Sequence, residues 1–344
     1  MPRKPETSDR NVTIDDIAKA ANVSIATVSR ALNHPELLKK DTRELVLKIV
    51  DELGYIRSGA AMALASNQTF TVGAIIPTFN NAIFAASMAG FEKGLSREGY
   101  TLLVTVSNFD PKQEIKQLRK LLERGVDAIL LIGLDHPKQV FELLRRSGCC
   151  VVSIFGSSTQ GEIPGIGFDN AQASKAIVAH LASMGHRRMG MISGITTDND
   201  RARDRKNGVI NALQDHRFTY DPALFLECHY SHHHGREALS TLLVQAQPPT
   251  AIICGNDVLA MGALFEASSR GIDVPGELSI TGFDNLPITE HLRPSLTTID
   301  VPPEEMGIAA ARSITDNLRF GKAIESRLLQ ANLLIRETTG KIAP

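Results

Sequence analysis

The sequence predicts an all-α headpiece followed by a two-lobed α/β body with parallel sheets. Roughly the first 55 residues show helix-type apolar spacing and no strand pattern. From Thr71 onward, short apolar runs alternate with helical stretches, and nearly continuous apolar strands are typical of parallel sheets covered on both faces. The alternation occurs in two series, which favours two doubly wound lobes.

Composition excludes several classes of protein. The chain has 344 residues, of which 43% are hydrophobic and 22% charged, as in ordinary globular proteins. No apolar run is long enough to cross a membrane, and residues 1–10 are too polar for a secretory signal. We therefore expect a protein that stays in the cytoplasm and has no membrane partner.

Charge and cysteine content allow a nucleic-acid partner but no disulfide framework. The net charge of -1 neither requires nor excludes a polyanion, because a local surface can differ from the whole. Four cysteines, with Cys149 and Cys150 adjacent, are too few and too poorly spaced to staple the chain. We expect reduced and mostly buried thiols.

Three helices are expected in the headpiece, over about residues 14–21, 25–32 and 41–54. Thr13 followed by Asp16 is typical of a capped helix start. Asn22 can adopt the left-handed conformation that a tight turn needs, and Ser24 then caps the second helix.

The first two helices have the spacing of a helix-turn-helix, whose second helix reads the DNA major groove. Small Ala18 and Ala21 allow the helices to cross closely, while Val23 and Val28 fill the angle between them. The candidate DNA contacts are the hydroxyls of Ser24, Thr27 and Ser29 for phosphates, and Ile25, Ala26 and Arg30 for base edges. The alternative is a three-helix unit that binds nothing.

The body is expected to alternate strands and helices in the order of a doubly wound fold. The expected strands cover residues 72–76, 102–106, 128–132, 150–155, 189–193, 251–254 and 278–281. The expected helices cover residues 85–97, 113–123, 138–146, 173–184, 203–213, 238–243 and 258–269.

Several longer motifs together resemble the lactose/galactose repressor (LacI/GalR) family of bacterial transcription factors. They are TVSRALN at 27–33, ELGYI at 52–56, MGHRR at 184–188, GND at 255–257, GFDN at 282–285, PxLTTI at 294–299 and LIRETT at 334–339. The resemblance implies a repressor that binds a pseudo-palindromic double-stranded operator as a homodimer, under the control of a small-molecule effector. It also implies a bacterial cytoplasmic protein associated with the nucleoid through its operator.

The resemblance implies three regions: a DNA-binding headpiece at 11–57, a hinge at 58–69, and an effector-binding and dimerisation body at 70–344. The body is similar to periplasmic sugar-binding proteins, with three chain crossings between its lobes. Lobe one is expected at about 70–168 and 301–325, and lobe two at about 169–300 and 326–344. The short stretch after Arg336 leaves no room for a tetramerising zipper, so we expect a dimer.

Within the family, the hinge becomes helical when two subunits meet on an operator, and a leucine from each enters the minor groove. Leu64 occupies that place here, although it could instead pack on the body. The positions that the resemblance adds to the DNA-contacting set are Asn33, Tyr55, Ala61 and Leu64.

The hinge departs from the family pattern just after Ile56. Arg57 replaces the common proline and Ser58 the common asparagine, with Gly59 following. Ser58 can still cap a hinge helix, and Arg57 can add a phosphate contact. We expect a looser hinge than in relatives.

Ligands of two-lobed α/β proteins bind beyond the carboxyl ends of the strands. The residues expected there, by position and by resemblance, are Phe84, Arg205, Tyr230, Asn256 and Asp284. Such a set suits a small polyol, sugar or sugar acid. Each residue has a structural alternative: loop or turn shaping for Asp284 and Asn256, a solvated helix face for Arg205, and plain core for Phe84 and Tyr230.

We expect no metal, no cofactor and no enzymatic activity. Consecutive side chains of the run His232–His234 are expected to point in different directions, and Ser231 is expected to cap a helix there, so a shared metal is disfavoured. The sheets carry no dinucleotide fingerprint, P-loop or nucleophile elbow.

Overall fold

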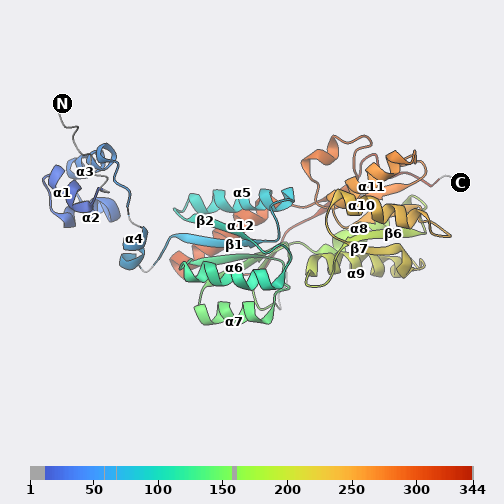
Figure 1. The fold of residues 1–344 in the computed structure, drawn as a ribbon, viewed down its shortest axis with the longest axis horizontal. Helices are drawn as coiled ribbons and strands as arrows, with labels where there is room; N and C mark the ends of the chain where they lie inside the picture. The colour runs from blue at the N-terminus through green and yellow to red at the C-terminus, as the bar shows by residue number, and fades with distance from the viewer. Residues whose placement is uncertain (1–11, 58, 67, 157–160, 343–344) are drawn as a thin grey trace, which may run out of the picture. The chain divides into compact units, whose positions relative to one another are not determined.

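The computed structural model describes residues 12–57, 59–66, 68–156 and 161–342, with the backbone alone at 33, 60, 61, 64 and 65. It divides into two compact units, Met1–Thr69 and Phe70–Pro344, each of which is described by itself (Figure 1). In the described ranges, no helix has both the length and the apolar character needed to cross a bilayer.

The described part of the first unit contains helices and no strand, as predicted. Its elements are α1 (Ile14–Ala20), α2 (Ile25–Asn33), the 3-10 turn η1 (Pro35–Leu37), α3 (Lys40–Leu53) and α4 (Gly59–Ser66). Thr13 and Asp16 form a reciprocal capping box at the start of α1, and Asn22 is left-handed with φ +50. Ser24 caps α2 as expected. Fully buried apolar side chains hold the three helices together: Ile17, Val28 and Val46.

The first sheet of the body has the strand order β11-β5-β4-β3-β1-β2 and is parallel throughout. Its strands are β1 (Thr71–Ile76), β2 (Thr101–Val106), β3 (Ala128–Ile132), β4 (Cys150–Ile154), β5 (Gly165–Gly167) and β11 (Arg327–Leu328). Its helices are α5 (Ala82–Ser96), α6 (Pro111–Glu123), α7 (Lys138–Ser147) and α12 (Pro303–Phe320). Figure 1 shows α5 and α12 on one face and α6 and α7 on the other.

Both faces of this sheet are buried, which explains the nearly unbroken apolar strands. Side chains alternate along a strand, so Val72, Ala74 and Ile76 pack in the core shared with α5 and α12. Ile75 points the other way and packs against α6 and α7. A Cβ at Gly73 would lie 2.9 Å from the Leu121 side chain, so a larger residue there would make that leucine shift.

The second sheet has the order β7-β6-β8-β9 and is also parallel. Its strands are β6 (Met189–Gly194), β7 (Phe225–Cys228), β8 (Ala251–Cys254) and β9 (Ser279–Thr281). The helices around it are α8 (Asn170–Ser183), α9 (Asp200–Asp215), α10 (His232–Leu243) and α11 (Asp257–Ser269). Contacts between α8 and α9, and between α10 and α11, make two helical layers.

Three chain segments join the lobes, as expected. They follow β5, β10 (Thr298–Asp300) and β11. After the last crossing, β12 (Asn332–Leu334) pairs antiparallel with β10. The expected end of lobe one at residue 325 is wrong by a few residues. Arg327 and Leu328 pair with Ile166 and Gly167 of the first sheet, so lobe one extends to Leu328.

Candidate functional site

The start of α2 presents the side chains predicted to read DNA. Ile25 is 49% exposed, and Ser24, Ala26 and Arg30 are exposed beside it. Val28, on the opposite side of the helix, is fully buried in the headpiece core. The first turn of α2 therefore has one face packed on the headpiece core and the opposite face exposed to solvent, as major-groove docking requires.

The hydroxyls at this helix start are partly engaged within the protein. Ser24 Oγ accepts from the Thr27 amide at 3.1 Å and lies 2.9 Å from Thr27 Oγ1. Thr27 and Ser29 are half-buried. To bind a phosphate, Ser24 or Thr27 would thus have to use the hydroxyl hydrogen-bonding capacity that the helix cap does not already use.

The remaining headpiece positions divide into two groups. Tyr55 is half-buried and packs on the headpiece core. The side chains of Asn33, Ala61 and Leu64 lie outside the described residues, as does Ser58. The Arg57 guanidinium, which can add a phosphate contact by its position, donates to the carbonyl of Leu32.

In the body, all five residues expected to bind the effector line a single cavity between the lobes. Its walls are Asn81, Ile83, Phe84, Phe109, Phe155, Asn199, Arg201, Arg205, Tyr230, Asn256 and Asp284. Phe84 comes from lobe one and the other four expected residues from lobe two. The cavity lies beyond the carboxyl ends of the strands, as expected for this architecture.

Arg205 is the most constrained of these side chains. It lies on α9 and is 6% exposed, which rules out the solvated-face alternative. Its Nε donates to Asn170 Oδ1 at 2.8 Å and its Nη1 to the Gly255 carbonyl at 2.7 Å. The guanidinium also lies 3.7 Å from the centre of the Phe283 ring. These contacts hold a buried positive charge at the cavity wall.

Asp284 faces this charge from the loop after β9. Its Oδ1 lies 3.6 Å from Arg205 Nη2, and its backbone has φ +113, which side-chain-bearing residues seldom adopt. The position is held by the amide of Asp284, which donates to the Ile299 carbonyl at 3.0 Å. Burial raises the pKa of Asp284 to about 6, and the charges of Arg205 and Arg201 oppose the rise.

Asn256 and the aromatic residues complete the cavity. Asn256 is buried and its Oδ1 caps α11 by accepting from Leu259 N at 2.9 Å, so it shapes a helix start and lines the cavity at once. Tyr230 and Phe109 come from opposite lobes, with ring centres 5.9 Å apart. Phe84 packs edge-on against Phe155 at 5.6 Å.

Two further cavities adjoin the first. One has a volume of about 380 Å³ and shares Phe109 and Arg201 with it, and the other, of about 340 Å³, shares Asn81, Asn199 and Tyr230. The central cavity itself measures about 30 Å³, which is room for roughly one water molecule. A sugar-sized ligand therefore does not fit within the central space alone.

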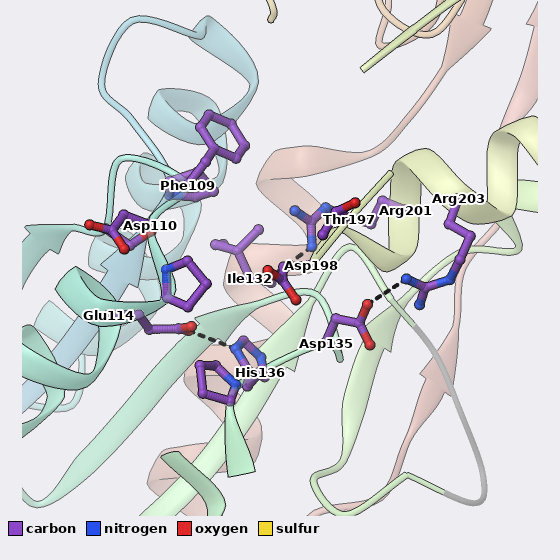
Figure 2. Close-up of a pocket in the computed structure, with 14 residues that line it drawn as sticks. Phe109, Asp110, Glu114, Ile132, Asp135, His136, Thr197, Asp198, Arg201 and Arg203 are labelled. Atoms are coloured by element: carbon purple, nitrogen blue, oxygen red, sulfur yellow. Dashed lines mark hydrogen bonds and ion pairs between the residues drawn. The ribbon is translucent and has the colours of Figure 1, made fainter. Parts of the chain in front are cut away.

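Polar contacts cross between the lobes at the edge of the 380 Å³ cavity. Arg203 of α9 reaches Asp135 at 2.6 Å, as Figure 2 shows, and Arg201 Nη1 donates to the Ile132 carbonyl at 3.0 Å. The Leu134 amide donates to Asp200 Oδ2 at 2.9 Å. The first turn of α9 is thus tied to the loop after β3.

Sequence reasoning missed Asn81, Phe109, Asn199 and Arg201 as cavity residues. Asn81 and Asn199 are the N-caps of α5 and α9, and a cap role alone is enough to explain an asparagine at such a position in the sequence. Phe109 follows β2 at its carboxyl end, which is the signal that could have found it. Arg201 lies in a charged stretch that appeared to be a solvated face, whereas its side chain is 12% exposed.

The cysteines and histidines form neither a disulfide nor a metal site in the described part of the chain. All four cysteines are free thiols, and burial raises the pKa of Cys149 to about 12 and that of Cys228 to about 11. No group of His, Cys, Asp or Glu in these ranges is arranged to hold a metal ion.

Comparison with known proteins agrees with both units. Residues 13–58 match the family model "Bacterial regulatory proteins, lacI family", and residues 178–339 match "Periplasmic binding protein-like domain". Catabolite control protein A of Priestia megaterium is 32% identical over 320 residues, covering 93% of this chain and 96% of that protein. The HTH-type transcriptional repressor CytR of Escherichia coli K12 is 32% identical over 339 residues, covering 98% of each.

A solved structure has the same architecture. A LacI-family transcriptional regulator from Silicibacter pomeroyi superposes with a TM-score of 0.84 at 27% identity, covering 95% of this chain and 99% of that one. These relatives are regulators and not enzymes. With a helix-turn-helix headpiece and a two-lobed ligand-binding body, the chain belongs to the lacI family of bacterial regulatory proteins and is a DNA-binding transcription regulator.

Proposed function

We propose that the protein is a homodimeric repressor that binds a pseudo-palindromic operator and responds to a small polar effector in the interlobe cavity. One observation carries the proposal: Phe84, Arg205, Tyr230, Asn256 and Asp284 line one cavity in a chain that also has a DNA-reading headpiece. Each subunit would read one half-site, and two-fold symmetry would make the operator pseudo-palindromic. The protein would act in the cytoplasm, associated with the nucleoid through that operator.

The chemistry of the cavity favours a sugar, a sugar acid or a similar polyol as effector. Asp284 offers a carboxylate that accepts hydroxyl hydrogen bonds, and Phe109 and Tyr230 offer apolar ring faces. Arg201 and Arg205 give the walls more positive than negative charge, which allows a carboxylate on the ligand. The 30 Å³ central space links ligand entry to lobe movement, so an effector that prefers one lobe arrangement shifts the DNA-competent population.

The proposal is tested by fluorescence anisotropy of the full-length protein on DNA from upstream of its own gene, at about 0.15 M salt. Sugars and sugar acids are added one at a time. We expect much tighter binding than to unrelated DNA, with release by an inducer or tightening by a corepressor. If a genomic pull-down also enriched no palindromic sequence, sequence-specific repression would be contradicted.

One variant and one hydrodynamic measurement separate the parts of the proposal. Asp284→Ala is expected to keep operator binding and lose the effector response, whereas a normal response would place the effector elsewhere. Sedimentation is expected to give a dimer at micromolar concentration, and a stable monomer or tetramer there would contradict the proposed assembly.

A further inference from the structure

The C-terminal end of the DNA-reading helix α2 has an unusual partner. The last carbonyls of any helix lack amide donors of their own helix. At the end of α2, the Arg30 carbonyl accepts from the His34 amide at 2.7 Å, and the Leu32 carbonyl accepts from the guanidinium of Arg57. A cation at this end also interacts favourably with the helix dipole.

The same guanidinium touches the hinge helix. Arg57 Nη1 lies 3.9 Å from the thioether sulfur of Met62, which is on α4. Arg57 itself lies between α3 and α4. One half-buried side chain thus contacts α2 through a carbonyl and α4 through a sulfur, and its own backbone lies in the connection from α3 to α4.

The hinge helix α4 is short. α4 spans only Gly59–Ser66, and helices this short are marginal in water. Glycine at its first position lowers helix propensity further. At the C-terminal end of α4, Ser66 Oγ donates to the Met62 carbonyl at 2.9 Å, so this hydrogen bond lies within the last turn of the helix. An anchor from outside the helix therefore matters more than in a long helix.

We propose that Arg57 is a positioning residue that fastens the hinge helix α4 to the end of the DNA-reading helix α2 before DNA is bound. This rests on the proposed function, in which the hinge takes part in operator binding. A guanidinium held on the Leu32 carbonyl orders residues 59–66 in the free protein, so less order has to be gained on the operator. This role differs from a phosphate contact, in which the side chain would act only once DNA is present.

The first test is amide hydrogen exchange of the full-length, DNA-free protein, comparing wild type, Arg57→Ala and Arg43→Ala. Arg43 is an exposed arginine of α3 and controls for the loss of one headpiece charge. We expect exchange across residues 59–66 to be about tenfold faster in Arg57→Ala, from the loss of a charge-assisted bond, and unchanged in Arg43→Ala. Unchanged exchange in Arg57→Ala would overturn the proposal. So would faster exchange throughout α1, α2 and α3, because Arg57 would then stabilise the whole headpiece.

The second test measures operator affinity against salt concentration for the same variants. A positioning role predicts weaker binding by Arg57→Ala, by about tenfold, with the slope of log K against log salt unchanged. A slope smaller by about 0.9 would identify Arg57 as a phosphate contact instead. Since the exchange measurement needs no DNA, it stands even if wild type bound no operator, and that second failure would contradict only the proposed function.

Discussion

Arg205 and Asp284 form a buried pair of opposite charge at the cavity wall, with 3.6 Å between Nη2 and Oδ1. Arg205 is held by Asn170, the Gly255 carbonyl and the Phe283 ring. Because the arginine is held by these other groups, it keeps its position when the pair is weakened. A ligand hydroxyl or carboxylate that enters the cavity therefore meets a fixed cation and a carboxylate whose charge depends on pH.

Asp284→Asn tests that pH dependence through the stability of the protein. The pKa of Asp284 is about 6 in the folded chain and about 3.9 when unfolded. The folded state thus holds its proton more tightly between those values, and wild-type stability falls as pH rises through that window. As pH rises from 4.5 to 7, the free energy of unfolding of Asp284→Asn should therefore increase by about 2 kcal/mol relative to that of wild type.

Urea denaturation at the two pH values measures this gain. Asp198→Asn is the matched control, because Asp198 is an exposed carboxylate of the adjoining cavity. Equal pH dependence in wild type and Asp284→Asn would show that the carboxyl is not desolvated in the folded chain.

Gly194→Ala should disturb the cavity through Tyr230. A Cβ at position 194 would lie 2.1 Å from the Tyr230 hydroxyl, so the ring has to move. We expect effector affinity to fall about tenfold or more, as for displaced positioning groups, with operator binding unchanged. Titration of the effector response measures this. In a Tyr230→Ala background the same glycine change should have no further effect, and an additive loss would mean that Gly194 acts by another route.

Arg30→Ala should separate base reading from general DNA binding. The arginine is exposed one turn into α2, and arginine is the usual bidentate partner of guanine in the major groove. We expect a loss of about 1–3 kcal/mol on the operator and relaxed base preference at one position of each half-site. Binding to a set of single-base operator variants measures this, with Arg43→Ala as the control. Weaker binding with unchanged base preference would assign Arg30 to a phosphate.

The sequence predicted the fold and part of the site because both depend on local patterns. The capping pair Thr13 and Asp16 and the left-handed Asn22 are local, and the structure confirms both. Strand β11 was missed because it has only two residues, Arg327 and Leu328, both exposed. No apolar pattern marks such a strand, and its place depends on pairing with residues far away in the chain.

The composition of the cavity shows the same limit. Asp284 and Asn256 were predictable because they follow strands at their carboxyl ends. The burial of Arg205 was left open, since it depends on Asn170 and Phe283, which lie far from it in sequence. The contact between Phe109 and Tyr230 needs both lobes in place, so no local pattern encodes it.

Gly133→Ala should loosen the contacts that cross between the lobes. Gly133 has φ +83, and a Cβ there would lie 1.7 Å from Arg201 Nη1 and 2.5 Å from Asp200 Oδ1. Alanine would thus strain the backbone and also displace the two α9 side chains that bond to Ile132 and Leu134. We expect the free energy of unfolding to fall by about 2–4 kcal/mol, because left-handed strain adds to the loss of two hydrogen bonds. We also expect faster release of the effector.

Gly148→Ala is the control that isolates the contact from the strain. Gly148 is also left-handed, with φ +65, but has nothing within 4 Å of an added Cβ. Backbone strain alone should therefore lower the free energy of unfolding of Gly148→Ala, by about 1–2 kcal/mol. Effector release should stay at the wild-type rate. Urea denaturation and stopped-flow release measure both quantities. If the two alanine variants released effector equally fast, the bonds of Asp200 and Arg201 across the lobes would have no part in holding the cleft closed.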